Sequence, residues 1–135
     1  MGTVRVGVTI GTDNVLTTPV TISSGKSFTA DSGSVTRVKL APVATDPSNP
    51  IIYKATDKLD RTYLYVRNLA TELEKFVYLW VDGSSEDIVI AKLGGGEFTF
   101  IPVPSDKTFR AYGTDVDQLI EYAVFGLDNS STTLG

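Results

Sequence analysis

Residues 59–82 read LDRTYLYVRNLATELEKFVYLWVD, and two apolar runs within this stretch decide the fold class. In the first run, Leu64 and Val66 alternate with tyrosines. In the second run, Val77 and Leu79 alternate with aromatic residues in the same way. Successive side chains of a β-strand point to opposite faces of a sheet, so this period of two residues predicts two β-strands.

The connection between the two runs holds the one helix candidate in the sequence. Thr71-Glu72-Leu73-Glu74 has the spacing of a capping box, in which a threonine and a glutamate three residues later cap the first helical turn. Only Lys75 separates this motif from the strand that opens at Phe76, so we expect one helical turn at most.

Further strands follow toward the C-terminus at short spacing. Asp82-Gly83 is a hairpin signal, and Gly94-Gly95-Gly96 tolerates the positive φ that a sharp corner requires. Pro102 and Pro104 lack a backbone N–H, so their strand should end there or lie at a sheet edge. The pattern predicts an all-β fold, an antiparallel β-sandwich. Its predicted strands are 59–69, 76–82, 88–93, 97–103, 107–112 and 119–125.

The N-terminal part of the chain predicts shorter strands. Residues 4–10 alternate between Val or Ile and smaller or polar residues, and candidates at 19–22, 26–30 and 35–40 follow between Ser- and Gly-rich turns. Residues 41–50 contain three prolines and must run extended or turned. We therefore expect three parts: residues 1–50 as N-terminal strands of the same sandwich or as an extended arm, 51–127 as the sandwich body, and 128–135 as a flexible tail.

Composition excludes several classes of chemistry. The 135 residues, enough for a single domain, include no cysteine and no histidine, so disulfides, thiolate catalysis and most zinc sites and hydrolytic triads are absent. The net charge is −4 and the basic residues are scattered along the sequence, so we expect no nucleic-acid partner. No apolar run approaches the roughly 20 residues that span a bilayer, and residues 1–5 lack the pattern of a secretory signal, so we expect synthesis in the cytosol and no membrane partner.

Both faces of the two strands predicted within residues 59–82 are apolar. Aliphatic side chains fall on one face and aromatic side chains on the other. A sandwich in water needs one apolar face per sheet, so the aromatic face is either covered by the N-terminal part of the chain or used as a subunit interface or ligand platform. Tyrosine and tryptophan are enriched at interfaces. The candidate interface residues are Tyr63, Tyr65, Phe76, Tyr78 and Trp80, with Val4, Val6 and Val8 of the first strand.

An aromatic surface also suits a carbohydrate. Trp80 with Tyr65 and Tyr78 is the candidate sugar platform, and a carbohydrate-binding module or a tail fibre or spike domain is the alternative function. No Asn, Asp, Gln or His is interleaved on that face to receive sugar hydroxyls, which weighs against this alternative.

The candidate metal ligands are acidic residues. Asp82, Glu86 and Asp87 offer oxygen ligands that suit calcium, but they lack the regular spacing of a calcium loop, and we expect no metal and no cofactor. Asp115 and Asp117 offer a second pair of oxygen ligands and also lack the spacing of a calcium loop.

Without cysteine and histidine, catalysis would have to rest on carboxylates, Lys or Tyr, and Glu97 and Glu121 are the candidate acid pair. Nothing in their spacing points to a glycosidase, so we predict no catalytic residues and no enzyme.

Three segments carry a resemblance to a known group of proteins. They are Tyr63-Leu64-Tyr65-Val66-Arg67-Asn68-Leu69, then Leu93-Gly94-Gly95-Gly96-Glu97-Phe98 leading to Ile101-Pro102-Val103, and finally Ile120-Glu121-Tyr122-Ala123-Val124-Phe125-Gly126. This succession of strands and corners resembles small β-sandwich structural proteins of tailed bacteriophages over residues 59–126.

The resemblance implies a virion protein, made in the host cytoplasm, that decorates or cements the capsid. It also implies a jelly-roll-like topology. The implied partners are the major capsid protein and copies of the chain itself, with a homotrimer as one arrangement.

Overall fold

The computed structural model describes residues 2–11, 21–31, 35–40, 42, 51–81, 88–114 and 118–128. These residues form β-strands joined by turns and contain no helix, and the strand pairs are antiparallel, which confirms the predicted all-β, antiparallel class. The strands are β1 (Gly2–Gly11), β2 (Thr21–Ala30), β3 (Thr36–Leu40), β4 (Ile51–Tyr53), β5 (Lys58–Asn68), β6 (Val77–Val81), β7 (Ile88–Leu93), β8 (Phe98–Pro104), β9 (Phe109–Gly113) and β10 (Gln118–Asp128).

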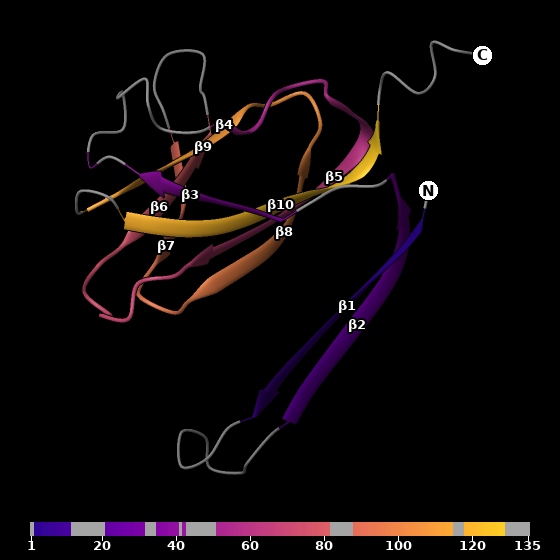
Figure 1. Ribbon diagram of the computed structural model, residues 1–135. Helices are drawn as coiled ribbons and strands as arrows, with labels where there is room; N and C mark the ends of the chain where they lie inside the picture. Colours follow the sequence, from indigo (N-terminus) through magenta and orange to yellow (C-terminus); the bar gives the residue numbers. More distant parts are fainter. Residues whose placement is uncertain are drawn as a thin grey trace. The chain divides into compact units, whose positions relative to one another are not determined.

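The chain divides into two compact units, Met1–Ser32 and Gly33–Gly135 (Figure 1). The first unit contains β1 and β2, which pair as a hairpin along their whole length. The second unit, called the body below, contains β3 to β10. Part of the N-terminal segment 1–50 therefore belongs to the body, because β3 pairs with β10.

The hairpin corrects one prediction about the N-terminal part. We expected Ser23-Ser24-Gly25 to separate two short strands, but β2 continues through these residues, which pair with Thr9, Val8 and Gly7. Backbone hydrogen bonds to a neighbouring strand hold serine and glycine in extended conformation despite their preference for turns. The predicted tail beyond residue 128 and most of the Pro-rich segment 41–50 lie outside the described residues.

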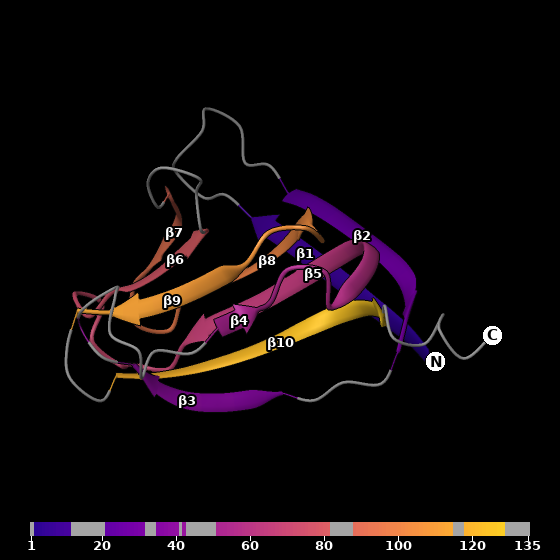
Figure 2. The ribbon, with the colours of Figure 1, turned by 90° about the horizontal axis from the view of Figure 1, so that it is seen from above.

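The body consists of two four-stranded sheets (Figures 1 and 2). One has the order β3-β10-β5-β8 and the other the order β4-β9-β6-β7. The pairs nest along the sequence: β6 pairs with β7, β5 with β8, β4 with β9 and β3 with β10. β8, which contains Pro102 and Pro104, lies at an edge of its sheet, as the missing N–H groups predicted.

Both sheets contribute side chains to one hydrophobic core. Leu64 and Val66 of β5 and Val77 and Leu79 of β6 are fully buried, which confirms that the aliphatic positions of both strands face inward. Burying a valine or leucine side chain contributes about 1.5–3 kcal/mol. The buried cluster comprises Leu40, Ile52, Tyr53, Leu64, Val66, Val77, Leu79, Leu93, Val103, Phe109, Ala111 and Ile120.

The connection between β5 and β6 carries the chain from one sheet to the other. Residues 71–74 form a bend and a turn there, not the helical turn that the capping-box motif allows. The Lys75 N–H donates to the Glu72 carbonyl at 3.1 Å, so the segment closes on itself within four residues. A crossing this short leaves no room for a helix.

Candidate functional site

The aromatic candidates of β5 and β6 lie on two surfaces and not on the single face that we expected. Tyr63 and Tyr65 project from the outer side of the β3-β10-β5-β8 sheet, called the β5 face below. Tyr78 and Trp80 project from the outer side of the other sheet, called the β6 face. The reason is that β5 and β6 belong to different sheets, so their outward positions point in opposite directions. Their role as interface residues stays a prediction.

The β5 face carries a row of aromatic rings across three strands. The Tyr63 ring stacks on Phe100 of β8 with centroids 5.8 Å apart, and the Phe100 ring lies 6.4 Å from that of Phe125 on β10. Cross-strand pairing places these residues together, because Phe125 lies opposite Tyr63 and Phe100 lies opposite the adjacent outward residue, Tyr65. Phe98 follows on the same side of β8 and is 60% exposed.

Beside these rings, a carboxylate links three strands of the same sheet. The Tyr65 hydroxyl donates to Glu121 Oε1 at 2.8 Å, and Arg37 Nε donates to Glu121 Oε2 at 3.0 Å. The hydrogen bond from Tyr65 and the bond and charge of Arg37 hold the pKa of Glu121 below its ordinary value. Burial, and then the neighbouring carboxylate, raise the pKa of Tyr65. At neutral pH the structure thus holds a charged Glu121 against a neutral tyrosine.

This arrangement predicts an acid-dependent contribution to stability. The pKa of Glu121 is lowered on folding, so the contribution is present above the ordinary glutamate pKa of 4.5 and is lost as pH falls through the lowered value. Between pH 7 and pH 3, the wild-type free energy of unfolding should therefore fall more steeply than that of Glu121→Gln, measured by urea denaturation at each pH. Asp106→Asn, which removes the same charge from the exposed turn after β8, should retain the wild-type slope. Parallel curves for wild type and Glu121→Gln would contradict the prediction.

The β6 face combines aromatic rings with cations. Tyr78 stacks on Tyr112 of β9 with centroids 4.9 Å apart. Lys92 Nζ lies 4.1 Å from the centre of the Phe76 ring, and the Arg110 guanidinium lies 5.9 Å from that of Trp80.

The burial of Trp80 and the separation of the two faces argue against the predicted sugar platform. Trp80 is only 5% exposed, so its ring offers little surface for a sugar to stack on. Tyr65 lies on the other outer face, so Trp80, Tyr78 and Tyr65 do not form one platform. The geometry therefore gives the carbohydrate alternative no support.

The valine candidates lie on one side of the β1–β2 hairpin. Val4 lies opposite Phe28, and Val8 and Ile10 follow on the same side of β1. Val8 and Ile10 are 43% and 51% exposed, and Val4 and Val6 are half-buried. The opposite side carries small and polar residues: Thr3, Arg5, Gly7 and Thr9 on β1, and Ser23, Gly25, Ser27 and Thr29 on β2. The side of Val4 and Val8 also carries Lys26 and Ser24, opposite Val6 and Val8. The hairpin therefore has one mainly apolar side, called the valine side below.

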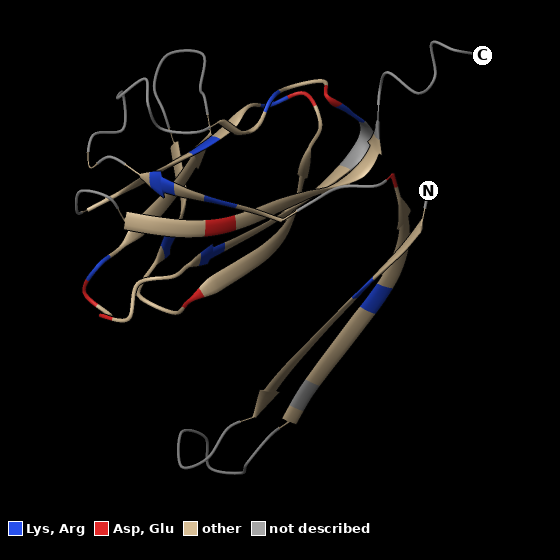
Figure 3. Cartoon of the chain, in the orientation of Figure 1, with Lys and Arg blue, Asp and Glu red and all other residues tan. Residues whose placement is uncertain are grey.

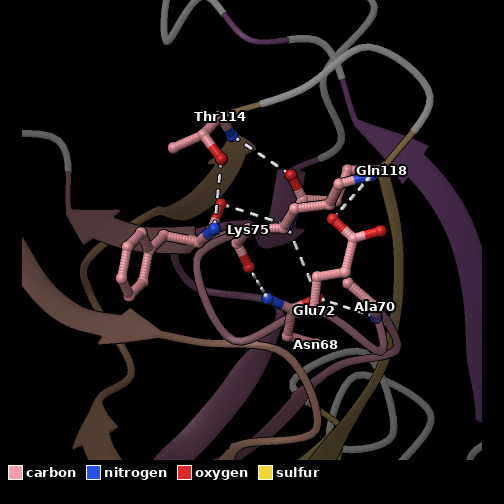
Figure 4. Close-up of polar contacts among 7 residues, drawn as sticks. Asn68, Ala70, Glu72, Lys75, Thr114 and Gln118 are labelled. Atoms are coloured by element: carbon pink, nitrogen blue, oxygen red, sulfur yellow. Dashed lines mark hydrogen bonds and ion pairs between the residues drawn. The ribbon is translucent and has the colours of Figure 1, made fainter.

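A buried polar cluster centred on Asn68 was missed at the sequence level (Figure 4). Asn68 is completely buried. Its Nδ2 donates to the carbonyl oxygens of Lys75 at 2.7 Å and Leu93 at 2.9 Å, and its Oδ1 accepts from the Ala70 N–H at 3.0 Å. A signal was present, because position 68 continues the inward positions 64 and 66 with a polar residue.

Gln118 extends this cluster toward the β9–β10 connection. Its Nε2 donates to the Phe76 carbonyl at 3.1 Å, and its Oε1 accepts from the Thr114 N–H at 3.2 Å. The amides of Asn68 and Gln118 thereby link the β5–β6 connection to the end of β7 and to the start of the β9–β10 connection. Since their donors and acceptors are engaged by the chain itself, the cluster is structural and offers no ligand site.

The acidic candidates do not form a pair in the described residues. Glu97 Oε1 accepts from the Gly94 N–H at the corner between β7 and β8, whereas Glu121 is engaged by Tyr65 and Arg37. Each carboxylate therefore has its own partners and a local structural role.

The metal candidates Asp82, Glu86, Asp87, Asp115 and Asp117 lie outside the described residues. Within residues 51–81, 88–114 and the other described ranges, no group of three or more Asp or Glu side chains is placed to hold a metal ion. In the same ranges no helix is long and apolar enough to cross a membrane.

Comparison with known proteins adds no relative from which a function could be transferred. No protein-family model matches the sequence, and neither a curated protein nor a solved structure matches the chain. The function is therefore argued from the residues and their geometry.

Proposed function

We propose that this protein is a virion structural subunit of a tailed phage, a decoration protein that binds the capsid lattice and copies of itself. The observation that carries the proposal is the β1–β2 hairpin with its one-sided valine surface. A two-stranded hairpin is marginally stable by itself in water, and exposed apolar side chains on one of its sides favour binding to another surface. The phage resemblance in residues 59–126 is the reason for proposing a tailed-phage particle as the assembly.

The proposal includes a jelly-roll sandwich for the body. Its support is the nested pairing of β6 with β7, β5 with β8, β4 with β9 and β3 with β10, together with the two four-stranded sheets. A jelly roll is an eight-stranded double sheet built from two Greek keys, and it recurs in viral capsid domains. Fold alone does not assign function, so the assembly role rests on the hairpin and the resemblance.

The direct test is quantitative mass spectrometry of density-banded particles from a lysate of the source. A copy number near that of the most abundant particle protein is the expected result for a decoration protein. A few copies per particle would replace the decoration role with a tail or fibre role. Absence from the particles would contradict the virion proposal altogether.

Substitution on the valine side tests the observation that carries the proposal. In Val8→Asp, a carboxylate replaces an exposed side chain of that side, and burying it in an interface costs several kcal/mol. We expect the copy number on purified particles to fall at least about tenfold, since 1.4 kcal/mol corresponds to a factor of ten. The unfolding midpoint of the body should not change.

Thr9→Asp is the matched control for this substitution. It adds the same charge to the neighbouring residue, which lies on the opposite side of the same strand. It should be incorporated at the wild-type level. Equal incorporation of Val8→Asp and wild type would show that the valine side does not bind the particle.

A further inference from the structure

Basic residues outnumber acidic residues on the described strands (Figure 3). Most basic residues lie on the described strands, whereas most acidic residues lie outside them. The described strands therefore carry more basic than acidic residues, in a chain whose net charge is −4. The acids that do lie on strands are Asp60, Glu121 and Asp128.

At one end of the β5 face, arginine side chains lie beside an exposed phenylalanine ring. Arg67 of β5 lies directly opposite Phe98 of β8, and both side chains are exposed. Arg37 of β3 projects from the same face, with 67% of its side chain exposed even though it pairs with Glu121. Glu121 lies between the two arginines in the same row, directly opposite Arg37 and Arg67, so this end carries two cations around one carboxylate. Arg37, Arg67 and Phe98 are called the basic aromatic patch below.

The connection between β5 and β6 has the complementary composition. Leu73 is 63% exposed and stands between two carboxylates, those of Glu72 and Glu74. This segment, residues 72–74, is called the acidic knob below. It is held in shape by the bond from the Lys75 N–H to the Glu72 carbonyl and by close packing of Leu73 against the glycine corner at Gly94. The Glu72 carboxylate pairs with Lys75 Nζ at 3.7 Å, which leaves Glu74 as the carboxylate available to a partner.

Both features lie at the same end of the body. The Asn68 N–H donates to the Glu97 carbonyl, which places the start of the knob connection beside the start of β8. A molecule that carries a patch and its complement side by side can pair with a second copy about a two-fold axis, with each knob on the other copy's patch. The Glu74 carboxylate would then meet Arg67, and Leu73 would cover Phe98.

We infer that the basic aromatic patch binds the acidic knob of a second copy of this chain. The inference rests on the proposed function, since it names one partner of the assembling subunit and the surface that this partner occupies. Opposite charges across an interface give specificity and register, and the paired apolar groups give contact area.

A charge swap in the full-length protein tests this pairing. Arg67→Glu and Glu74→Arg should each weaken self-association by about tenfold or more, because each sets like charges against each other. The double variant Arg67→Glu/Glu74→Arg should regain wild-type self-association, since it restores the opposite charges in reverse order. Sedimentation velocity over a concentration series measures the association constant, and circular dichroism confirms that each variant is folded.

Two further variants support the interpretation of the swap. Asp106→Arg makes a comparable acid-to-arginine change in the described turn after β8 and should self-associate like wild type. Phe98→Ser removes an exposed ring without touching the core and should weaken self-association in the same range as the single charge variants.

Three outcomes would overturn the inference. They are a monomeric wild type throughout the series, a double variant no stronger than the single variants, and a Phe98→Ser variant that associates like wild type. Aromatic rings beside cations also suit single-stranded nucleic acid, so poly(dT) is titrated in parallel. Binding of poly(dT) that Arg67→Glu abolishes, with no self-association, would assign the patch to nucleic acid instead. A monomeric protein that still reaches near parity on particles would refute this pairing and leave the decoration role standing.

Discussion

Replacing Asn68 with leucine is expected to lower the free energy of unfolding by about 3–4 kcal/mol. Leucine has a similar volume, so the change leaves no large cavity and isolates the hydrogen bonds. It removes the partners of the Lys75 and Leu93 carbonyls and of the Ala70 N–H. A buried polar group left without a partner costs about 1–3 kcal/mol, so these losses together take up a large part of the stability of a small domain. Urea denaturation followed by circular dichroism measures the effect.

Thr62→Val is the matched control on the same strand. Thr62 is as deeply buried as Asn68, but its Oγ1 has no hydrogen-bond partner in the described part of the chain. Replacing this hydroxyl with a methyl group of similar shape should leave stability unchanged or raise it by up to about 1 kcal/mol. Equal losses for Asn68→Leu and Thr62→Val would show that general burial, and not the amide network, accounts for the role of position 68.

Adding one methyl group at Gly95 is expected to destabilise the body by about 2–3 kcal/mol. The β-carbon of Gly95→Ala would collide with the Glu72 carbonyl oxygen and would lie 2.8 Å from the Ala70 carbonyl oxygen. Both obstacles are backbone atoms of the β5–β6 connection, so they cannot move aside as a flexible side chain can. The loss should be visible as a lower urea midpoint with an unchanged m-value.

Gly96→Ala separates the two reasons for glycine at this corner. A β-carbon there meets nothing within 4 Å, but the residue has a φ of +81°, which residues with an L side chain rarely adopt. Its expected cost is about 1 kcal/mol of backbone strain, clearly less than that of Gly95→Ala. A larger loss at Gly96 than at Gly95 would show that backbone conformation, and not close packing, sets the requirement. The sequence predicted a corner at residues 94–96 but not this division of roles.

For the candidate surfaces, too, the sequence predicted local features but not how distant residues are arranged. Alternation assigned Tyr65 and Tyr78 to outward positions, which is where both lie. It could not show that they face away from each other, because the period of a strand says nothing about the sheet to which the strand belongs. Ring partners such as Phe100 and Tyr112 depend on that assignment and became visible only with the strand pairing.

Local chemistry was enough to predict the strand class and the inward aliphatic positions such as Leu64 and Leu79. For the proline-containing strand β8 it left two alternatives, a strand that ends at its prolines or one at a sheet edge. Each of these follows from side-chain alternation or a missing backbone donor within a few residues. The tertiary structure alone decided which strands are neighbours, as in the Arg37–Glu121 contact between residues 84 positions apart. It also decided that Asn68 is satisfied and that Gly95 has no room for a side chain. These features depend on backbone groups that approach one another only after distant strands have paired, and the energies that select such pairings are not encoded in any short stretch of the chain.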